Sequence, residues 1–275
     1  MSEPQLSAEV APVDVALAAL GWTVRRFASL ASTNDTARKA ALEGHPGRLW
    51  VIAEEQTAGR GRRGRHWASP RGNLYASALI NDPAPVARGA EIGFVAGLAL
   101  HRAICDLGGA DFSLKWPNDL IWRGAKAAGL LAEGVSRSDG RFACIVGIGV
   151  NCLVAPTLDG RPTVDLSRAL GRRILPTEVF ARLGLRFDEA LQEWRRGDGF
   201  AAIRSAWLAA ASGLGETIRI SDPSGVREGL FEALDARGRL LLRRAERLEI
   251  VEAGDLTLIG EGAGSAPLAD GLASS

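Results

Sequence analysis

The densest group of chemically active side chains is the segment Gly-Arg-Gly-Arg-Arg-Gly-Arg at residues 59–65. Guanidinium groups bind carboxylate and phosphate oxygens through paired hydrogen bonds, and glycines let a backbone close tightly over a ligand. Four arginines within six residues would repel one another unless an anion lay among them. We therefore predict a loop that is mobile when empty and is ordered by a bound polyanion.

The glycine spacing of this loop is similar to that of two nucleotide-binding motifs, but neither motif is complete in this chain. A dinucleotide-binding G-x-G-x-x-G needs a helix that starts inside the motif, but Pro70 and Gly72 follow too closely for one to propagate. A P-loop needs Lys and then Ser or Thr after its last glycine, and this chain has neither there. A solvated arginine-rich loop and an RNA-binding Gly-Arg segment stay open, although the latter usually occurs as repeats. We favour an anion-binding lid.

A second segment suited to chemistry is Lys-Trp-Pro-Asn-Asp at 115–119. Pro117 restricts the preceding residue to an extended conformation and stops a strand, so the Asn-Asp pair should lie on a fixed turn. A plain turn would explain that pair alone. The chain contains just three lysines, Lys39, Lys115 and Lys126, so a lysine beside a rigid Trp-Pro pair indicates a functional position.

Glycines also alternate in a strand-like run, where Gly147 and Gly149 share one face. Gly129 lies on an earlier segment that also carries Lys126. Glycine weakens a strand, but it allows a ligand to approach the backbone closely. This pattern predicts a sheet face that is open to a flat ligand such as adenine.

Composition limits the class of protein. The 275 residues carry 33 basic and 32 acidic side chains, a net charge of +1, which excludes a footprint for bulk nucleic-acid binding. No apolar run reaches the ~18 residues of a membrane span, and no signal peptide begins the chain, so we expect a cytoplasmic protein. Cys105, Cys144 and Cys152 lack metal-binding spacing and are expected to be buried thiols, and the three histidines are too scattered for zinc.

Hydrophobic periodicity and the positions of glycine and proline predict the elements that hold these residues in place. In chain order we expect a helix at 35–44, strands at 49–56 and 73–80, a helix at 87–107, short strands between 112 and 150, and helices at 177–195 and 199–211. Runs of strands broken by helices, without regular βαβ alternation, favour an α+β domain around a mixed sheet.

The pattern changes near Gly213–Gly215 to short strands joined by turns. This predicts a small C-terminal β-barrel at 214–260, close to the lower size limit for independent folding and therefore docked on the main domain. The main, catalytic domain would span 13–213. Residues 1–12 and 261–275 lack periodicity and are predicted to be flexible ends.

Together these segments resemble the biotin protein ligases, the family of biotin–[acetyl-CoA-carboxylase] ligases. Order and spacing agree across roughly residues 32–151. The matching segments are Ser-Thr-Asn at 32–34, Glu55-Gln56, the arginine loop with Trp67, Lys-Trp-Pro-Asn-Asp at 115–119, Lys126 with Gly129, and Gly-Ile-Gly-Val-Asn at 147–151. The resemblance implies a mixed-sheet catalytic domain of the biotin/lipoate protein ligase type, followed by a small SH3-like β-barrel. The C-terminal residues resemble that barrel only in their pattern of short strands joined by turns.

The resemblance also assigns roles to residues. Biotin would be bound by Ser32, Thr33, Asn34, Gln56, Gly59, Arg60, Gly61, Arg62, Lys126 and Gly129. The nucleotide would be bound by Arg62, Arg65, Trp67, Lys115, Asn118, Asp119 and Asn151. Lys126, Arg62 and Arg60 would be catalytic, and Asp119 would hold Mg²⁺. His66 departs from the lysine that many members carry at this point.

The implied reaction activates biotin with ATP and Mg²⁺ to biotinyl-5'-AMP and pyrophosphate, and then transfers biotin to a lysine of a biotin carboxyl carrier protein of acetyl-CoA carboxylase or a related carboxylase. Zinc, haem, NAD and a membrane are not expected to take part. About 20 residues precede the first ligase-like strand, too few for the winged helix-turn-helix of some bacterial members, so we expect a short form without operator binding.

Two alternative functions remain open. A lipoate–protein ligase would share the reaction type, although the arginine loop favours biotin. A nucleic-acid-binding regulator would need a basic domain, which the near-neutral chain disfavours. The number of subunits is left open, a homodimer included.

Overall fold

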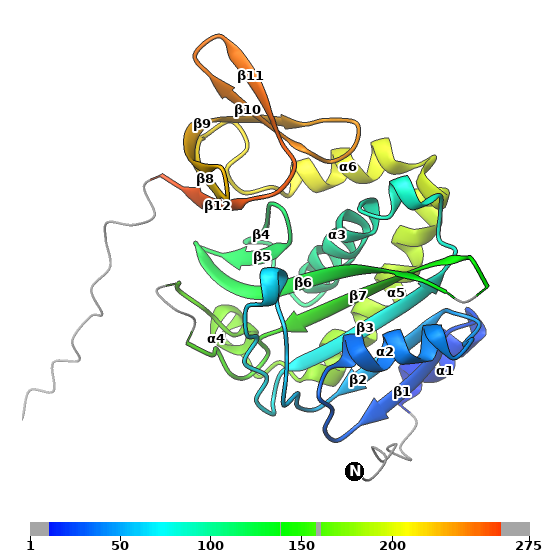
Figure 1. Cartoon of the computed structure of the whole chain (residues 1–275). Coiled ribbons are helices and arrows are strands. Elements are labelled where there is room, and N and C mark those ends of the chain that lie inside the picture. Colours follow the sequence, from blue (N-terminus) through cyan, green and yellow to red (C-terminus); the bar gives the residue numbers. More distant parts are fainter. Residues whose placement is uncertain (1–10, 138, 158–160, 260–275) are drawn as a thin grey trace, which may run out of the picture.

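The computed structural model describes residues 11–137, 139–157 and 161–259 and has two β-sheets (Figure 1). The larger sheet has seven strands in the order β1-β2-β3-β7-β6-β5-β4, with β1 and β2 parallel and the other neighbours antiparallel. These strands are β1 Thr23–Phe27, β2 Leu49–Ala53, β3 Leu74–Asn81, β4 Phe112–Lys115, β5 Asp119–Trp122, β6 Ala125–Ser136 and β7 Phe142–Val150. The predicted α+β fold around a mixed sheet is confirmed.

Helices cover both faces of this sheet, which explains why every residue of β2 is buried. They are α1 Pro12–Ala19, α2 Thr33–Leu42, α3 Glu91–Cys105, α4 Leu166–Leu170, α5 Pro176–Trp194 and α6 Phe200–Ala209. Helix α2 packs against β2, β3 and β7 on one face, and α3 and α5 pack on the other (Figure 1). Short 3-10 turns lie at Arg62–Gly64, Val86–Arg88 and Arg195–Gly197.

Helix α2 begins where the sequence predicts a polar cap. The Ser32 hydroxyl accepts a hydrogen bond from the Asp35 backbone N–H at 3.4 Å, which satisfies one of the donors that a helix start leaves without an intrahelical partner. The first helical turn therefore carries Thr33 and Asn34, and both are buried. This cap places three predicted ligand-binding side chains at the edge of the sheet.

The C-terminal sheet is antiparallel in the order β11-β10-β9-β8-β12. Its strands are β8 Thr217–Asp222, β9 Gly225–Leu234, β10 Leu240–Arg244, β11 Arg247–Val251 and β12 Asp255–Leu258. Buried side chains form its core: Ile218, Ile220, Phe231, Leu234, Leu240, Leu242, Val251 and Leu256. The expected small β domain is present, and it lies over β4 and β12 faces the larger sheet (Figure 1).

Several sequence expectations differ from the structure. Helix α1 was not predicted, because a short helix at the start of a domain carries little periodicity, whereas β1 begins after about 20 residues, where the resemblance implies the first strand. Strand β2 ends at Ala53, three residues early, because the chain turns there toward the arginine loop. The expectation that all three cysteines are buried is wrong for Cys105, which ends α3 on the exposed side.

The predicted flexible end at 261–275, and residues 1–10 of the other predicted flexible end, lie outside the described residues. Helix α6 ends at Ala209 and β8 begins at Thr217, so the connection between the two sheets falls between these residues. Within the described part of the chain, no helix is long and apolar enough to cross a lipid bilayer.

Candidate active site

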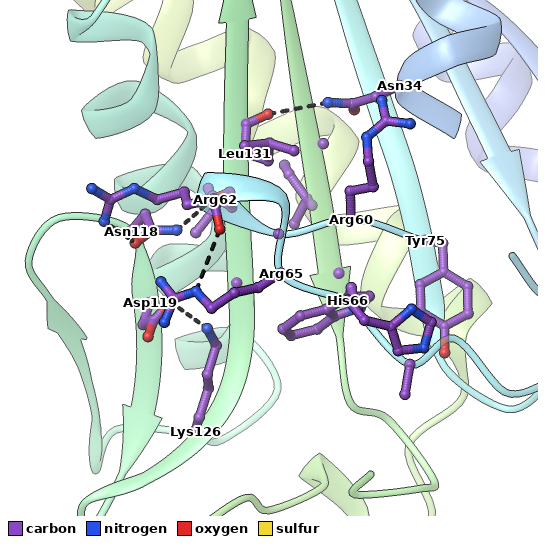
Figure 2. Close-up of a pocket in the computed structure, with 18 of the residues that line it drawn as sticks. Asn34, Arg60, Arg62, Arg65, His66, Tyr75, Asn118, Asp119, Lys126 and Leu131 are labelled. Atoms are coloured by element: carbon purple, nitrogen blue, oxygen red, sulfur yellow. Dashed lines mark hydrogen bonds and ion pairs between the residues drawn. The ribbon is translucent and has the colours of Figure 1, made fainter. Parts of the chain in front are cut away.

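A cavity of about 510 Å³ lies beside the larger sheet and collects most of the residues singled out in the sequence. Those that line it are Ser32, Thr33, Asn34, Gln56, Arg60, Gly61, Arg62, Arg65, Trp67, Lys115, Asn118, Asp119, Lys126 and Gly129. They come from the start of α2, the arginine loop, the turn between β4 and β5, and β6 (Figure 2). Asp255 and Leu256 of β12 add a wall from the C-terminal sheet.

One end of the cavity is a fixed network of polar side chains. The backbone N–H and the hydroxyl of Thr33 both donate to Gln56 Oε1, at 2.9 and 3.1 Å. Asn34 Nδ2 donates to a Glu133 carboxylate oxygen at 2.7 Å. It also donates to the Leu131 carbonyl at 3.4 Å (Figure 2). The fully buried Ser77 hydroxyl lies 2.6 Å from Asn34 Oδ1, which completes the partners of that amide. Buried polar groups with all partners made are held in one orientation, so this end is preorganised for a polar ligand.

Three of the four guanidinium groups of the arginine loop lie beside two carboxylates, those of Asp35 and Asp255. Arg60 forms two hydrogen bonds of 2.6 Å with the carboxylate of Asp35. Arg65 forms two of 3.1 Å with the carboxylate of Asp255. The predicted repulsion among the arginines is therefore relieved by internal carboxylates, which the sequence argument did not consider. Whether an anion further orders the loop stays a prediction.

Arg62 differs from its neighbours because it meets neutral acceptors. Its Nη1 donates to Asn118 Oδ1 at 3.1 Å and to the Gly254 carbonyl at 3.4 Å. Among the described residues, no carboxylate oxygen lies within 4 Å of its guanidinium nitrogens. Burial lowers the pKa of Arg62, since desolvation disfavours a charge. A half-buried cation without a carboxylate beside it is suited to an anionic ligand.

Trp67 explains the glycines on β6 and β7. A Cβ atom on Gly149 would lie 2.6 Å from the Trp67 Nε1, and one on Gly129 would lie 3.1 Å from the same ring. A Cβ on Gly147 would collide with Asn34. The glycines thus give room to protein side chains that line the cavity together with them, and the approach of a flat ligand to this face stays a prediction.

Lys126 and Asp119 form an ion pair of 2.6 Å inside the cavity (Figure 2). The Lys126 ammonium also lies 5.1 Å from the centre of the Trp67 ring, within the range of a cation–π interaction. Lys115 lines the cavity and lies opposite Asp119 in the register of the antiparallel strands β4 and β5. The cavity therefore holds two lysines and several arginines, with few carboxylates.

Two predicted ligand-binding residues do not line the cavity. Gly59 is buried, and a Cβ there would lie 2.5 Å from the Trp67 carbonyl, so this glycine lets the two ends of the loop meet. The Asn151 side chain donates to the backbone carbonyls of Lys126 and Val164, at 3.3 and 3.2 Å. The Asn151 amide therefore contacts these two backbone carbonyls and does not line the cavity.

Sequence reasoning missed five residues of the site: Asp35, Tyr75, Ser77, Glu133 and Asp255. Tyr75 and Ser77 stand two residues apart on β3, and the period-2 alternation of a strand predicts that they share a face. Asp35 follows the Ser-Thr-Asn segment directly. Asp255 carries no local signal, because its role depends on how the C-terminal sheet docks.

We expect the substitution Asp35→Asn to loosen the start of the arginine loop. The Arg60 hydrogen bonds lower the pKa of Asp35, so the charged pair is present at neutral pH and is lost as the pH falls through that lowered value. Because the pair is exposed, its loss should raise hydrogen exchange of residues 59–61 by about fivefold or less. Lys39→Ala, which breaks an exposed pair on the same helix, is the control. Equal exchange in Asp35→Asn and the parent protein would contradict this role.

Comparison with known proteins gives the family of the chain. The model of the biotin/lipoate A/B protein ligase family matches residues 27–151, and the model of the biotin protein ligase C terminal domain matches residues 213–257. A biotin--[acetyl-CoA-carboxylase] ligase of Paracoccus denitrificans is 37% identical, with 82% of this chain and 96% of that protein covered. The protein of the same name in Mycobacterium tuberculosis is 31% identical, with 86% and 89% covered.

Solved structures agree with the sequence comparison. The biotin protein ligase of Aquifex aeolicus in complex with biotin and ATP superposes with a TM-score of 0.74 at 26% identity. The match covers 86% of this chain and 98% of that one. Two domains matched in order, and a relative covered over almost its whole length, show that this chain belongs to the biotin protein ligase family.

Proposed function

We propose that the protein is an ATP-dependent biotin–protein ligase. The observation that carries the proposal is a single cavity with a fixed polar network at one end and Arg62, Lys115 and Lys126 at the other. A neutral ring system that makes hydrogen bonds suits the first end, and carboxylate and phosphate oxygens suit the second. Biotin joined to AMP has this distribution of groups.

In the proposed first step, a carboxylate oxygen of biotin attacks the α-phosphorus of ATP. A new O–P bond forms, the bond to the β-phosphate oxygen breaks, and pyrophosphate leaves with the electron pair. Two anions must approach each other, so cationic side chains that are already in place lower the barrier. Arg60, Arg62 and Lys126 are proposed for this role because all three line the cavity.

In the second step, an amine of a carrier-protein lysine attacks the carbonyl carbon of the mixed anhydride. An amide bond forms, AMP leaves, and the amine releases a proton to solvent. Neither step needs a covalent bond to the enzyme, so positioning and exclusion of water supply most of the catalysis. The proposed carrier is the biotin carboxyl carrier protein of acetyl-CoA carboxylase or a related carboxylase.

The cavity fits Mg²⁺ bound together with phosphates. Among the described residues no group of three or more His, Cys, Asp or Glu side chains could hold a metal ion alone. Asp119 brings a single carboxylate, and Mg²⁺ commonly uses one or two carboxylates with substrate phosphates and waters. When bound there, the ion would neutralise phosphate charge.

The proposal is tested by mixing the protein with ATP, Mg²⁺, biotin and an apo carrier domain, and detecting biotin on the carrier lysine. Omitting each component in turn should abolish the signal, and omitting the carrier should leave biotin-dependent ATP–pyrophosphate exchange. Replacing biotin by lipoic acid distinguishes the alternative ligase. Modification by lipoic acid alone, or none by either acid, would contradict the proposal.

The substitution Arg62→Gly tests the lid. Removing this guanidinium deletes the contacts to Asn118 and Gly254 that hold the loop over the cavity, so the activated intermediate should escape. We expect stray biotin on bystander proteins to rise about tenfold or more relative to biotin on the carrier, since one to two hydrogen bonds to a charged group are lost. Arg63→Gly, which removes the neighbouring exposed arginine with its long contact of 3.9 Å to Asp255 and places glycine at a left-handed position (φ 57°), is the matched control. An unchanged ratio in Arg62→Gly would rule out a lid held by this residue.

A further inference from the structure

Trp116 joins the two domains at the segment that carries cavity residues. Its side chain is 2% exposed, and its indole N–H donates to the Gly238 carbonyl at 3.2 Å. Gly238 belongs to the turn between β9 and β10 of the C-terminal sheet. Trp116 itself lines the cavity, as do Lys115 and Asn118 on either side of it in sequence. One short segment therefore contacts both the site and the second domain.

The turn that Trp116 holds is rigid. The Asp235 carboxylate accepts hydrogen bonds from the backbone N–H groups of Arg237 and Arg239, at 2.8 and 2.9 Å. Gly238 has φ 78°, and a Cβ there would lie 2.5 Å from the Phe94 ring on α3. The turn is held by its own hydrogen bonds and packs against α3. Strands β9 and β10 therefore keep a fixed position relative to α3, because closely packed elements move as rigid units.

A backbone contact next to Trp116 fixes the entry to the same domain. The Leu114 N–H donates to the Ala210 carbonyl, and the Ser212 N–H donates to the Leu114 carbonyl, both at 2.8 Å. Leu114 and Trp116 thus attach the C-terminal domain at two points, one on the chain that leads into it and one on its turn. Two separate attachments on one strand end restrict rotation as well as separation.

The C-terminal domain reaches the arginine loop through the start of β12. Asp255 accepts two hydrogen bonds from Arg65 and one of 3.3 Å from Arg161, and the Gly254 carbonyl accepts one from Arg62. These groups can meet the loop only while the domain keeps its position. The side chain that fixes this position is separate from the groups that contact the loop.

We propose that Trp116 is a positioning residue for the arginine loop. Its hydrogen bond to Gly238 fixes the position of the C-terminal domain relative to the larger sheet. That position places Asp255 beside Arg65. The consequence for catalysis rests on the proposed function, but the mechanical link between the two domains does not. Trp116 also lines the cavity. Trp116→Phe keeps an aromatic side chain, removes the indole N–H and changes none of the residues that hydrogen-bond to the loop, so loop exchange in the ligand-free protein reports this link.

The first test measures hydrogen exchange of the ligand-free, full-length protein. In Trp116→Phe we expect exchange in residues 59–67 to accelerate about three- to tenfold, the range that one net hydrogen bond supplies. Asp255→Asn should do the same, and the double variant should exchange no faster than Asp255→Asn alone. Multiplying effects in the double variant, or an unchanged loop while residues 235–240 exchange faster, would overturn the proposal.

Trp22→Phe is the matched control. It removes another buried indole N–H, which donates to Asp188 at 2.8 Å and does not line the cavity. This variant should lose thermal stability with no change at residues 59–67. Faster loop exchange in Trp22→Phe, equal to that in Trp116→Phe, would show a general loss of stability and overturn the proposal.

The second test uses kinetics. Trp116→Phe should raise the KM for ATP about three- to tenfold, and Asp255→Asn should raise it to a similar extent, because both variants displace the arginine loop, whose side chains line the cavity. A fall in kcat with KM unchanged would contradict the positioning role. If the parent protein shows no biotin-dependent exchange of pyrophosphate, the proposed function fails, and the hydrogen-exchange result still decides the role of Trp116.

Discussion

Replacing Lys126 by alanine is expected to lower biotin-dependent ATP–pyrophosphate exchange about 10³-fold. The ammonium lies inside the cavity, paired with Asp119 and seated over the Trp67 ring. A cation held at the place where charge develops is worth about 10²–10³ in rate, and no other described side chain can take its position. The measurement is the exchange rate at saturating ATP and biotin.

The fold should survive this substitution. The backbone N–H and carbonyl of Lys126 bond to Pro162 and Val164, and alanine keeps both bonds. Lys39→Ala, at an exposed lysine of α2, is the control and should leave exchange unchanged. The double variant Lys126→Ala, Asp119→Asn separates a lost cation from a carboxylate left without its partner. Recovery of exchange in the double variant, or near-normal exchange in the single one, would remove Lys126 from the catalytic set.

Gly149→Ala is expected to weaken ATP binding at least tenfold. The added Cβ would lie 2.6 Å from the Trp67 Nε1, and a Cβ on its cross-strand partner Gly129 would lie 3.1 Å from the same ring, so the ring lies directly on this glycine pair. Overpacking of this kind costs about 1–3 kcal/mol, so the ring must leave its place beside the cavity. Both the KM for ATP and the tryptophan fluorescence of the protein should change.

Gly93→Ala is the matched control for this glycine. A Cβ on Gly93 meets nothing within 4 Å, and alanine is a better helix former than glycine inside α3. We expect ATP binding to be unchanged and stability to rise by about 0.5–1 kcal/mol. An unchanged KM and unchanged fluorescence in Gly149→Ala would show that the ring adapts in place.

Much of the fold follows from local sequence. Alternation and glycine or proline breaks predict β3, β7 and α5, since each is long enough to show its period. The exposure of Cys105 could not be predicted, because a residue at a helix end faces the core or the solvent according to tertiary packing. Helix α1 packs against β1 and α5, so its presence also depends on contacts that are distant in sequence.

The sequence predicts which residues form the candidate site more completely than it predicts which of them contact one another. The arginine loop and Lys126 stand out because their types and spacing are unusual. The partners of these cations could not be predicted, since 25 residues separate Arg60 from Asp35 and 190 separate Arg65 from Asp255. Hydrogen bonds between residues so far apart depend on the docking of whole elements, which periodicity does not reveal.

Because Asp35, Asp119 and Asp255 already neutralise Arg60, Lys126 and Arg65, the protein carries its own counterions. An entering anion would displace fixed carboxylates instead of dissolved salt ions. Binding should then depend weakly on ionic strength, unlike binding to an open basic surface, where released ions make affinity fall steeply with salt. At these three positions an entering charge exchanges for one that the chain supplies, whereas the Arg62 guanidinium, which meets neutral acceptors, offers its charge without such an exchange.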